Sequence, residues 1–404
     1  SPSGVGTQTK YVIEALLKTG KFQVLSLGGA IKHQDYRPKM VEPYGEDWKI
    51  IPVDGYGTQE MIRSILRNEK IDILWLMTDP RFYGWLWDME SEIRSNIPMI
   101  YYHVWDNYPL PHYNKDNYES NDVIACISKV TEDIVKNVAP DVERHYIPHA
   151  VNGDIFKKFP DQEVQDFVNQ NFKQHKNKKI FFWNNRNARR KMSGSVLAWF
   201  NDFANKVGPD NVCLLMHTDV KDPHGQDLEQ IIKGIGADDG RVMFTTEKYP
   251  PEILAMLYNM STCTINIADA EGFGLATLES LSCGTPIIVN MTGGLQEQVT
   301  DGKEWFGIGL EPASKAVIGS QQVPYIFEDR VNGDEFIDAL EKIYNMSDEE
   351  IKELGSKGRK HVEKNYNFKD YEEKWIKLMD DVYEKYGSWE NRKGYQSWEL
   401  REIS

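Results

Sequence analysis

Short runs of apolar residues alternate with amphipathic stretches over the first part of the chain. The stretches 59–70 and 128–138 place apolar residues at helical spacing. The apolar runs around them are short and bounded by polar or turn residues, and they lie at 22–28, 72–77, 98–103 and 122–128. Alternation of strands and helices predicts a parallel sheet with helices on both faces. A strand end and a turn in 145–156 close this part.

A second alternating series follows a polar connector rich in Lys, Asn and Gln at 156–179, which predicts a surface helix between domains. The strands of this series are expected at 179–183, 212–217, 241–244, 263–267 and 286–290. With 404 residues, the chain is longer than one hydrophobic core usually serves. We therefore predict an α/β protein of two Rossmann-like domains, 1–155 and 156–370, followed by a helical tail, 371–404. Parallel sheets bind ligands at the carboxyl ends of their strands, so an interdomain cleft is the expected site.

The two ends of the chain carry further expectations. The first eight residues read as a loop before a helix, and an α/β unit places a strand ahead of such a loop. We therefore expect that a first strand precedes Ser1 in the natural protein, and the alternative is a fold that begins at a loop. In the tail, five apolar residues at helical spacing predict an amphipathic helix that must dock on another surface. These residues are Tyr371, Trp375, Leu378, Met379 and Val382.

Charge and cysteine content narrow the class of protein. The net charge of -15 argues against non-specific binding to nucleic acid or to an anionic membrane. It leaves room for a local basic site for a phosphorylated ligand, and for peripheral membrane contact. The four cysteines are widely spaced without a CxxC pair, which favours reduced thiols in a cytoplasmic protein over disulfides or a zinc site. No apolar run reaches about 18 residues, so no transmembrane helix is expected.

The segment EGFGLATLESLSCGTP at 271–286 is the most informative motif. The glycines at 272 and 274 indicate a turn that leaves backbone N–H groups free at a helix N-terminus, where phosphate binds. Glu279 then falls in an apolar helix, where a carboxylate needs hydrogen-bond partners such as a ribose diol. The alternative is a loop carboxylate at Glu271 and a solvent-facing one at Glu279. The apolar neighbours of Glu279 favour the ligand site.

The whole segment resembles the hallmark of glycosyltransferase family 4, retaining enzymes with the two-domain GT-B fold. The resemblance spans nearly the whole chain and is most specific in 179–300. It implies a C-terminal helix that crosses back to the first domain. It also implies that Glu279 holds the nucleotide ribose and that Glu271 contacts the transferred sugar. The backbone amides of Phe273, Gly274 and Leu275 would face the sugar and the diphosphate.

A basic loop at 183–192 follows the first strand of the second series. Such a run is commonly only a solvated loop. Fixed cations near a diphosphate leaving group, however, stabilise the charge that develops in the transition state. The family carries an arginine and a lysine at the spacing of Arg186 and Lys191, although Asn185 and Met192 replace its flanking glycines.

His103 ends an apolar strand, a position at which a lone histidine is commonly structural. The family has a histidine at the corresponding strand end, close to the transferred sugar. The resemblance implies that His103 positions or polarises the sugar, while the phosphate of the donor accepts the proton of the acceptor. Asp106 is a weaker candidate for similar work.

The remaining donor-binding candidates follow from the resemblance alone. Gly4 and Gly6 match a loop that lies against the diphosphate, and Thr245 opens the stretch to Tyr249 that would hold the base. The loop 292–297, with Gly293, Gly294 and Glu297, would shape the donor end of the cleft. His149 replaces an asparagine of the family's hinge strand and is interpreted as structural.

We therefore predict a retaining hexosyltransferase that moves a sugar from a UDP- or GDP-sugar to a hydroxyl acceptor. The loops 79–90 and 104–120, rich in Trp and Tyr, favour a saccharide or glycoconjugate acceptor. No Asp-x-Asp motif and no His/Glu cluster with ligand spacing is present, so no metal and no other cofactor is expected. Two alternatives stay open. One is another enzyme on the same fold, such as a phosphorylase or an epimerase, and the other is a degenerate binding protein without turnover.

Overall fold

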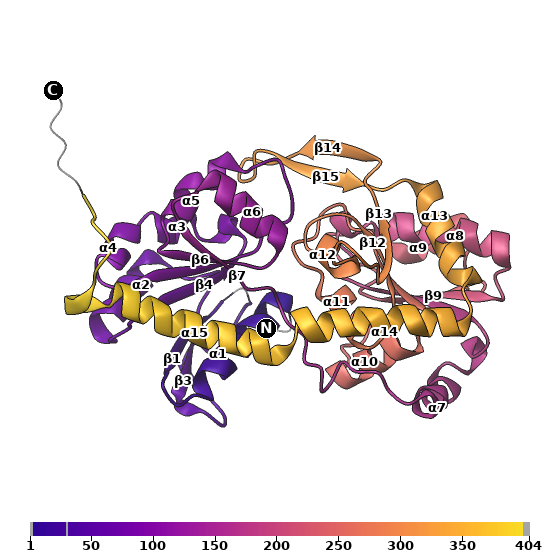
Figure 1. The fold of residues 1–404 in the computed structure, drawn as a ribbon, viewed down its shortest axis with the longest axis horizontal. Helices are drawn as coiled ribbons and strands as arrows, with labels where there is room; N and C mark the ends of the chain where they lie inside the picture. Colours follow the sequence, from indigo (N-terminus) through magenta and orange to yellow (C-terminus); the bar gives the residue numbers. More distant parts are fainter. Residues whose placement is uncertain (1–2, 30, 399–404) are drawn as a thin grey trace. The chain divides into compact units, whose positions relative to one another are not determined.

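The computed structural model describes residues 3–29 and 31–398, and the chain divides into two compact units (Figure 1). The first unit draws on Ser1–His149, Ser320–Pro324 and Lys369–Ser404. The second unit draws on Ala150–Gly319 and Tyr325–Phe368. None of the described helices is long and apolar enough to cross a lipid bilayer.

The first unit contains two sheets. Four parallel strands lie in the order β4 (Leu74–Thr78), β5 (Met99–His103), β6 (Val123–Cys126) and β7 (Glu143–Tyr146). In the other sheet, β1 (Val24–Gly28) pairs in parallel with β3 (Gly45–Pro52), and β3 pairs antiparallel with β2 (Lys39–Val41). The sequence analysis did not identify β2 and β3. Because β1 pairs with β3, it belongs to a three-stranded sheet with β3 and β2 and does not pair with β4.

The helices of the first unit begin with α1 (Gly4–Leu17), which is longer at its start than predicted. The Ser3 side chain accepts the N–H of Gly6 at 3.1 Å and so caps the helix. The prediction of a loop is therefore wrong for residues 4–8, while residues 1–2 lie outside the described part. The other helices of this unit before the tail are α2 (Gln59–Asn68), α3 (Gly84–Trp87), α4 (Glu90–Arg94), α5 (Lys115–Glu119) and α6 (Lys129–Val138).

The C-terminal helix α15 (Phe368–Tyr386) packs on the first unit, as the resemblance implied (Figure 1). Its five predicted apolar residues are all buried. Trp375 packs edge-on against Trp75 of β4 and Tyr102 of β5, with ring centroids 5.8 and 4.7 Å apart. Lys18 at the end of α1 forms an ion pair with Glu372 at 2.7 Å. The amphipathic pattern thus correctly predicted a docked helix.

The second unit is built on one six-stranded parallel sheet in the order β10-β9-β8-β11-β12-β13. The strands are β8 (Lys179–Asn184), β9 (Val212–His217), β10 (Val242–Thr245), β11 (Cys263–Asn266), β12 (Ile287–Asn290) and β13 (Gly307–Leu310). All five predicted strands are present, and β13 is additional. The strand order reverses direction between β8 and β11. In a doubly wound sheet, such a switch point is where ligands bind.

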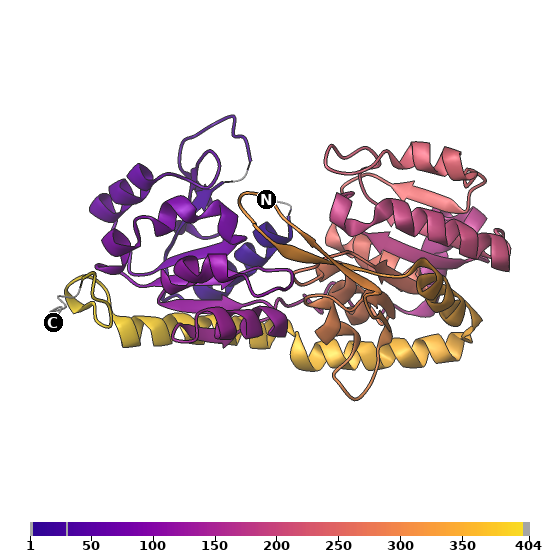
Figure 2. The same ribbon diagram turned by 90° about the horizontal axis from the view of Figure 1, so that it is seen from above.

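Helices cover both faces of this sheet (Figure 2). Phe181 of β8 packs against Phe200 and Phe203 of α8, whereas its neighbour Phe182 packs against Tyr258 of α10. Because successive strand residues point to opposite faces, α8 and α10 lie on opposite sides. The helices that share the core with α8 (Ser193–Val207) are α9 (Leu228–Ile235) and α13 (Gly333–Asn345). The helices grouped with α10 (Pro251–Met260) are α7 (Asp161–Asn171), α11 (Leu275–Ser282), α12 (Leu295–Val299) and α14 (Asp348–Asn365).

An antiparallel hairpin of β14 (Ser314–Ile318) and β15 (Ile326–Arg330) is inserted between β13 and α13. The sequence analysis did not predict it. Its second strand contributes two buried acidic side chains, Glu328 and Asp329, to the second unit.

Candidate functional site

The loops that follow β8 and β11 bring two predicted residues together at the switch point. Lys191 lies in a short 3-10 helix, Arg189–Lys191, and Glu271 lies five residues beyond the end of β11. The ammonium group of Lys191 forms a buried ion pair with the Glu271 carboxylate. Asn266 donates a further hydrogen bond to that carboxylate at 3.2 Å. The fold therefore places in contact two side chains that are 80 positions apart in sequence.

Glu271 is ionised at neutral pH. Burial by itself raises the pKa of this carboxyl group, but the charges of Lys191 and Arg190 outweigh burial and lower the pKa to about 2. A carboxylate with so low a pKa is a poor proton acceptor and a strong acceptor of hydrogen bonds. It is suited to holding a hydroxyl-bearing ligand in place.

Arg190 is a functional candidate that the sequence analysis missed. Its guanidinium lies 3.8 Å from the Glu271 carboxylate and donates to the carbonyl of Ala270. Its own carbonyl accepts the N–H of Asp269 at 2.8 Å. Among three consecutive basic residues only Lys191 matched the family spacing, so nothing in the sequence distinguished Arg190 from a solvated neighbour.

Arg186, the other predicted cation, is held by a residue that was not predicted. Its guanidinium donates to both carboxylate oxygens of Asp222, at 2.6 and 3.1 Å. The Arg186 side chain is 60% exposed, so it remains accessible to an anionic ligand. A phosphate would compete with Asp222 for the same donors.

The turn 271–275 ends in the N-terminus of α11. Gly274 adopts φ of 89°, a left-handed conformation that favours glycine. A Cβ at this position would lie 2.5 Å from Cδ2 of Leu295. No side chain caps the start of α11, so the first amides of the helix, from Leu275 onward, are available to an anion.

The loop after β12 presses against this turn. Gly294 donates its N–H to the Glu271 carbonyl at 3.2 Å, and Gly293 before it has φ of 48°. A Cβ on Gly294 would lie within 2.9 Å of backbone atoms of Gly272 and Phe273. The buried Phe273 carbonyl also accepts a hydrogen bond from the side chain of Gln298 at 2.7 Å. The two loops are therefore rigidly paired.

Glu279 lies on α11 in a different environment. Tyr258 of α10 donates its hydroxyl to Oε2 of Glu279 at 2.8 Å, and Asn184 at the end of β8 donates to the same hydroxyl at 2.8 Å. Burial raises the pKa of Glu279 to about 7, although the Tyr258 hydrogen bond lowers it. The carboxyl group is half-buried and has one oxygen hydrogen-bonded to Tyr258.

The region predicted to hold the base contains a stacked pair of rings. Thr245 ends β10, and its hydroxyl forms a hydrogen bond with Nδ1 of His217 at 2.9 Å. The His217 ring stacks on Tyr249, with centroids 5.3 Å apart and planes 17° apart. His217 was missed, although a polar residue at the carboxyl end of a predicted strand could have indicated it.

The predicted residues of the first unit lie at the ends of its elements. His103 ends β5 and is fully buried, with Tyr101 and Tyr118 hydroxyls at 2.9 and 2.8 Å from its two ring nitrogens. Burial lowers the pKa of His103 to about 3, so the ring is neutral at physiological pH. Gly4 and Gly6 lie in the first turn of α1.

Two further residues from the sequence analysis are buried and hydrogen-bonded. His149 lies against Tyr102, whose hydroxyl is 2.7 Å from Nδ1 of the histidine. Glu297 accepts a hydrogen bond from the hydroxyl of Tyr366 at 3.2 Å. Within residues 3–29 and 31–398, no group of three or more His, Cys, Asp or Glu side chains could hold a metal ion.

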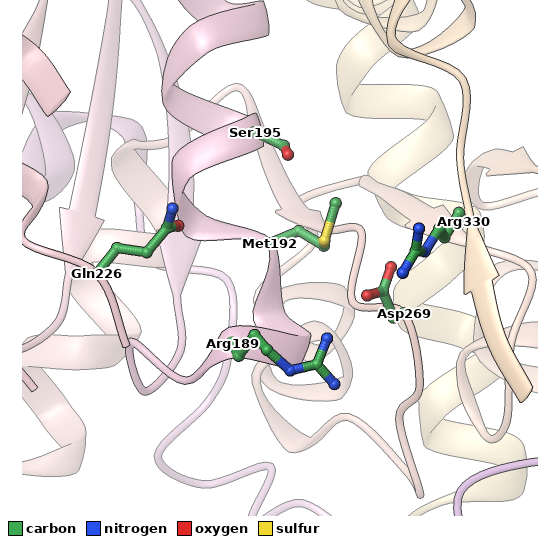
Figure 3. Close-up of a pocket in the computed structure, with 6 residues that line it drawn as sticks. All are labelled: Arg189, Met192, Ser195, Gln226, Asp269 and Arg330. Carbon is green, nitrogen blue, oxygen red and sulfur yellow. The ribbon is translucent and has the colours of Figure 1, made fainter. Parts of the chain in front are cut away.

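A separate cavity of about 320 Å³ adjoins the loop that carries Lys191 (Figure 3). Burial raises the pKa of Asp269, one of its lining residues, to about 6, with a further contribution from Glu328. Glu328 also pairs with two arginines of the lining. The cavity is lined by Arg189, Met192, Ser195, Gln226, Asp269 and Arg330, none of which was predicted as a site residue.

The two units together have the architecture of the GT-B class. The structure is similar to sucrose-phosphate synthase from Thermosynechococcus elongatus, with a TM-score of 0.74 and 17% identity over 95% of this chain and 94% of that one. It is also similar to Anabaena HepE in complex with UDP and glucose, with a TM-score of 0.68 and 12% identity over 94% of this chain and 97% of that one. These similarities confirm the predicted fold.

Similarity in sequence identifies the family. Residues 164–361 match the model of the family described as Glycosyl transferases group 1. The chain belongs to this family, family 4 of the glycosyltransferases, as its two-glutamate motif predicted. A curated relative, D-inositol 3-phosphate glycosyltransferase from Acidothermus cellulolyticus, is 38% identical over 86 residues, 21% of this chain and 19% of the relative. The match thus spans about a fifth of the length of that relative.

Proposed function

We propose that the protein transfers a hexose from a UDP- or GDP-sugar to a hydroxyl group of a saccharide or glycoconjugate, with retention at the anomeric carbon. One observation carries this proposal. The buried, ionised Glu271, paired with Lys191, lies at the start of the turn that leads to the uncapped N-terminus of α11. A hydroxyl-binding carboxylate, a fixed cation and a phosphate-binding helix end thus meet at one switch point.

The proposed donor site assigns one part of the nucleotide sugar to each group. The amides of Phe273, Gly274 and Leu275 bind the diphosphate, and Arg186 exchanges Asp222 for a phosphate oxygen. The Glu279 carboxyl group accepts the ribose hydroxyls.

Thr245 lies where the base would be held, and the loop with Gly293 and Gly294 supports the turn under the sugar. In the first unit, Gly4 and Gly6 belong to the first turn of α1, and an anionic group of the donor would replace the Ser3 side chain as the partner of the Gly6 N–H.

The reaction breaks the bond between the anomeric carbon and the phosphate oxygen. Negative charge then grows on the leaving diphosphate, and Lys191 and Arg186 stabilise it more in the transition state than in the ground state. The acceptor oxygen forms the new bond to the anomeric carbon, and its proton passes to an oxygen of the leaving phosphate. Glu271 orients the sugar instead of taking that proton, because its pKa of about 2 makes it a weak base.

His103 is proposed to position the sugar as a neutral ring. Its low pKa excludes an imidazolium role at physiological pH. Since both ring nitrogens have tyrosine partners, a sugar hydroxyl would replace Tyr101 or Tyr118 as the partner of one nitrogen. Asp106 is retained as a weaker candidate in the same loop.

The relatives support the substrate classes. HepE was solved with UDP and glucose, and the curated relative is named for glycosyl transfer involving D-inositol 3-phosphate. In the predicted acceptor loop 79–90, Phe82 is 39% exposed, and its ring stacks on that of Tyr56 with the centroids 4.5 Å apart. This pair offers an aromatic surface to a saccharide. We propose no metal and no other cofactor, because Lys191 and Arg186 supply the positive charge. The four cysteines are buried and unpaired, which supports a cytoplasmic location.

The proposal is tested by incubating the protein with a panel of UDP- and GDP-sugars, with and without saccharide acceptors. We expect release of nucleoside diphosphate from at least one donor and, with an acceptor, a product of the same anomeric configuration by NMR. Tight binding of a donor without any release would instead indicate the degenerate binding protein. No release and no thermal shift with any of these nucleotides would contradict the proposal.

A further inference from the structure

We propose that Tyr258 is a positioning residue of the nucleotide site. Together with Asn184, its hydroxyl holds the Glu279 carboxyl group in the orientation that accepts the two hydroxyls of a ribose. This inference rests on the proposed function, in which Glu279 binds the ribose. It adds two residues that neither the motif nor the family match assigns.

The three side chains form a chain of hydrogen bonds across three elements. The Asn184 amide at the end of β8 donates to the Tyr258 hydroxyl, and that hydroxyl donates to Oε2 of Glu279, each at 2.8 Å. A hydroxyl has one hydrogen to donate, so the bond from Asn184 directs that hydrogen toward Glu279. The Tyr258 hydroxyl is thereby oriented toward one oxygen of the carboxyl group.

The Tyr258 ring itself is held tightly. It is fully buried, and Phe182 and Phe156 pack edge-on against it at centroid distances of 5.1 and 6.2 Å. Tyr258 therefore presents its hydroxyl from a rigid position. One lone pair of Glu279 Oε2 is occupied, which leaves Oε1 and the rest of Oε2 to accept from a diol.

Charge around Glu279 points to the same role. Tyr258 on α10 donates a hydrogen bond to Glu279. Cys283, directly after α11, is a second titratable neighbour, and the Glu279 carboxylate raises its pKa. Lys158 and Arg359 act on Cys283, and in the described part of the chain neither forms an ion pair with Glu279. Unlike Glu271, Glu279 thus depends on a neutral hydroxyl to favour its ionised, hydrogen-bond-accepting form.

The test compares Tyr258→Phe with the unaltered protein by calorimetry. The ligands are UDP, GDP and their 2′,3′-dideoxy counterparts, measured from pH 6 to pH 9. We expect the variant to lose about five- to tenfold in affinity for the ribonucleotides, as for one hydrogen bond to a charged group. Affinity for the dideoxy forms should stay unchanged. The pH midpoint for ribonucleotide binding should also move upward, because Glu279 keeps its proton longer without the Tyr258 bond.

Two other variants keep the result interpretable. Asn184→Ala removes the bond that directs the hydroxyl and should shift affinity in the same direction by a smaller factor. Tyr344→Phe is the matched control, because Tyr344 of α13 is partly buried against the core on the opposite face of the sheet, and it should change neither the affinity nor the pH midpoint.

Three outcomes would overturn the inference. Equal loss for the ribose and dideoxy forms would show a merely structural role for Tyr258, and unchanged affinity and pH midpoint would show no role. Both leave the proposed function standing if UDP or GDP binds. If the unaltered protein binds neither nucleotide, the proposed function fails and the inference fails with it.

Discussion

The pKa values of two glutamates eight positions apart, Glu271 and Glu279, are shifted in opposite directions in this protein. Lys191 and Arg190 keep Glu271 ionised, with a pKa of about 2, whereas burial raises that of Glu279 to about 7. The same side-chain type thus has two different pKa values within one motif. Glu271 holds a permanent negative charge, and Glu279 changes its protonation near neutral pH.

The ion pair predicts the effect of removing its cation. Lys191→Met should raise the activation free energy derived from kcat/KM for the donor by about 2–4 kcal/mol, the range for loss of a preorganised charge stabiliser. Steady-state release of nucleoside diphosphate measures this. Lys206→Met is the matched control, because it removes the cation of a surface pair with Glu341 on α13 and should leave the rate unchanged. A Lys191→Met enzyme with full activity would remove Lys191 from the mechanism.

The raised pKa of Glu279 predicts a stability cost with a defined sign. In the unfolded chain this carboxyl group loses its proton near pH 4.5, and in the folded protein near pH 7. The folded state therefore binds more protons across this window, and stability falls as pH rises through it. Glu279→Gln should raise the free energy of unfolding by roughly 1–3 kcal/mol at pH 8.5 and by almost nothing at pH 4.5.

Urea denaturation at both pH values measures this difference. Nucleotide affinity should fall in the same variant at pH 8.5, because the amide presents only one accepting oxygen to the diol. Destabilisation by Glu279→Gln at pH 8.5 would contradict the assigned pKa shift.

At the residue scale, the sequence indicated the motif positions but not their partners. Glu271 and Glu279 stand in one recognisable motif and Lys191 in another, and the structure brings Lys191 and Glu271 into contact. Asp222 and Tyr258 could not be predicted, because each meets its partner, Arg186 and Glu279 respectively, only after strands distant in sequence have paired. The pKa of Glu271 depends on Lys191 and Arg190, and that of Glu279 on burial and Tyr258, so neither charge state could be predicted from the sequence.

At the element scale, the decisive feature is the close packing of two loops under the start of α11. Gly274 combines a left-handed backbone with direct contact to Leu295, so a side chain at this position is excluded twice over. Gly302 has a similar φ of 90°, but a Cβ added to it would have no neighbouring atom within 4 Å. Comparing substitutions at Gly274 and Gly302 therefore distinguishes the cost of backbone strain from the cost of losing the contact between the loops.

Gly274→Ala should therefore destabilise the protein and weaken donor binding, whereas Gly302→Ala should cost only the strain of its backbone, about 1 kcal/mol. Thermal unfolding with and without UDP or GDP distinguishes the two effects. Equal shifts in both variants, with unchanged nucleotide binding, would show that the contact between the loops has no part in the site.

The elements that could be predicted are those with a long apolar run or a clear helical face. Strands such as β5 and β12 are fully buried and read as continuous apolar segments, and α15 shows its docking face directly. The hairpin β14–β15 was missed because its burial pattern mixes exposed and buried residues without an apolar run. The start of α1 was misread because two glycines suggest a loop, while Ser3 caps a helix there.

At the scale of the whole molecule, the far end of the chain completes the first unit. Trp375 is fully buried between Trp75 and Tyr102, which lie about 300 positions earlier in the sequence. Residues 369–398 thus belong to the same compact unit as the N-terminal part. Helix α15 is therefore part of the hydrophobic core of that unit.

Trp375→Ala should accordingly cost about 3–5 kcal/mol in the unfolding of the first unit, as for other large buried aromatic residues. Denaturant unfolding followed by circular dichroism reports the loss. Tyr383→Ala, on the exposed side of the same helix at 51% exposure, should stay within about 0.5 kcal/mol. Similar losses in both variants would indicate that helix propensity, not docking, holds α15.

In the proposed division of roles, Glu271 acts on the transferred sugar and Glu279 holds the nucleotide. Its decisive test is donor kinetics with a single UDP- or GDP-sugar that the protein accepts, compared for the unaltered protein, Glu271→Gln and Glu279→Gln. We predict that Glu271→Gln lowers kcat at least about 30-fold with little change in nucleotide affinity, and that Glu279→Gln mainly raises KM. The same loss of kcat and the same KM in both variants, or full activity in Glu271→Gln, would contradict this division.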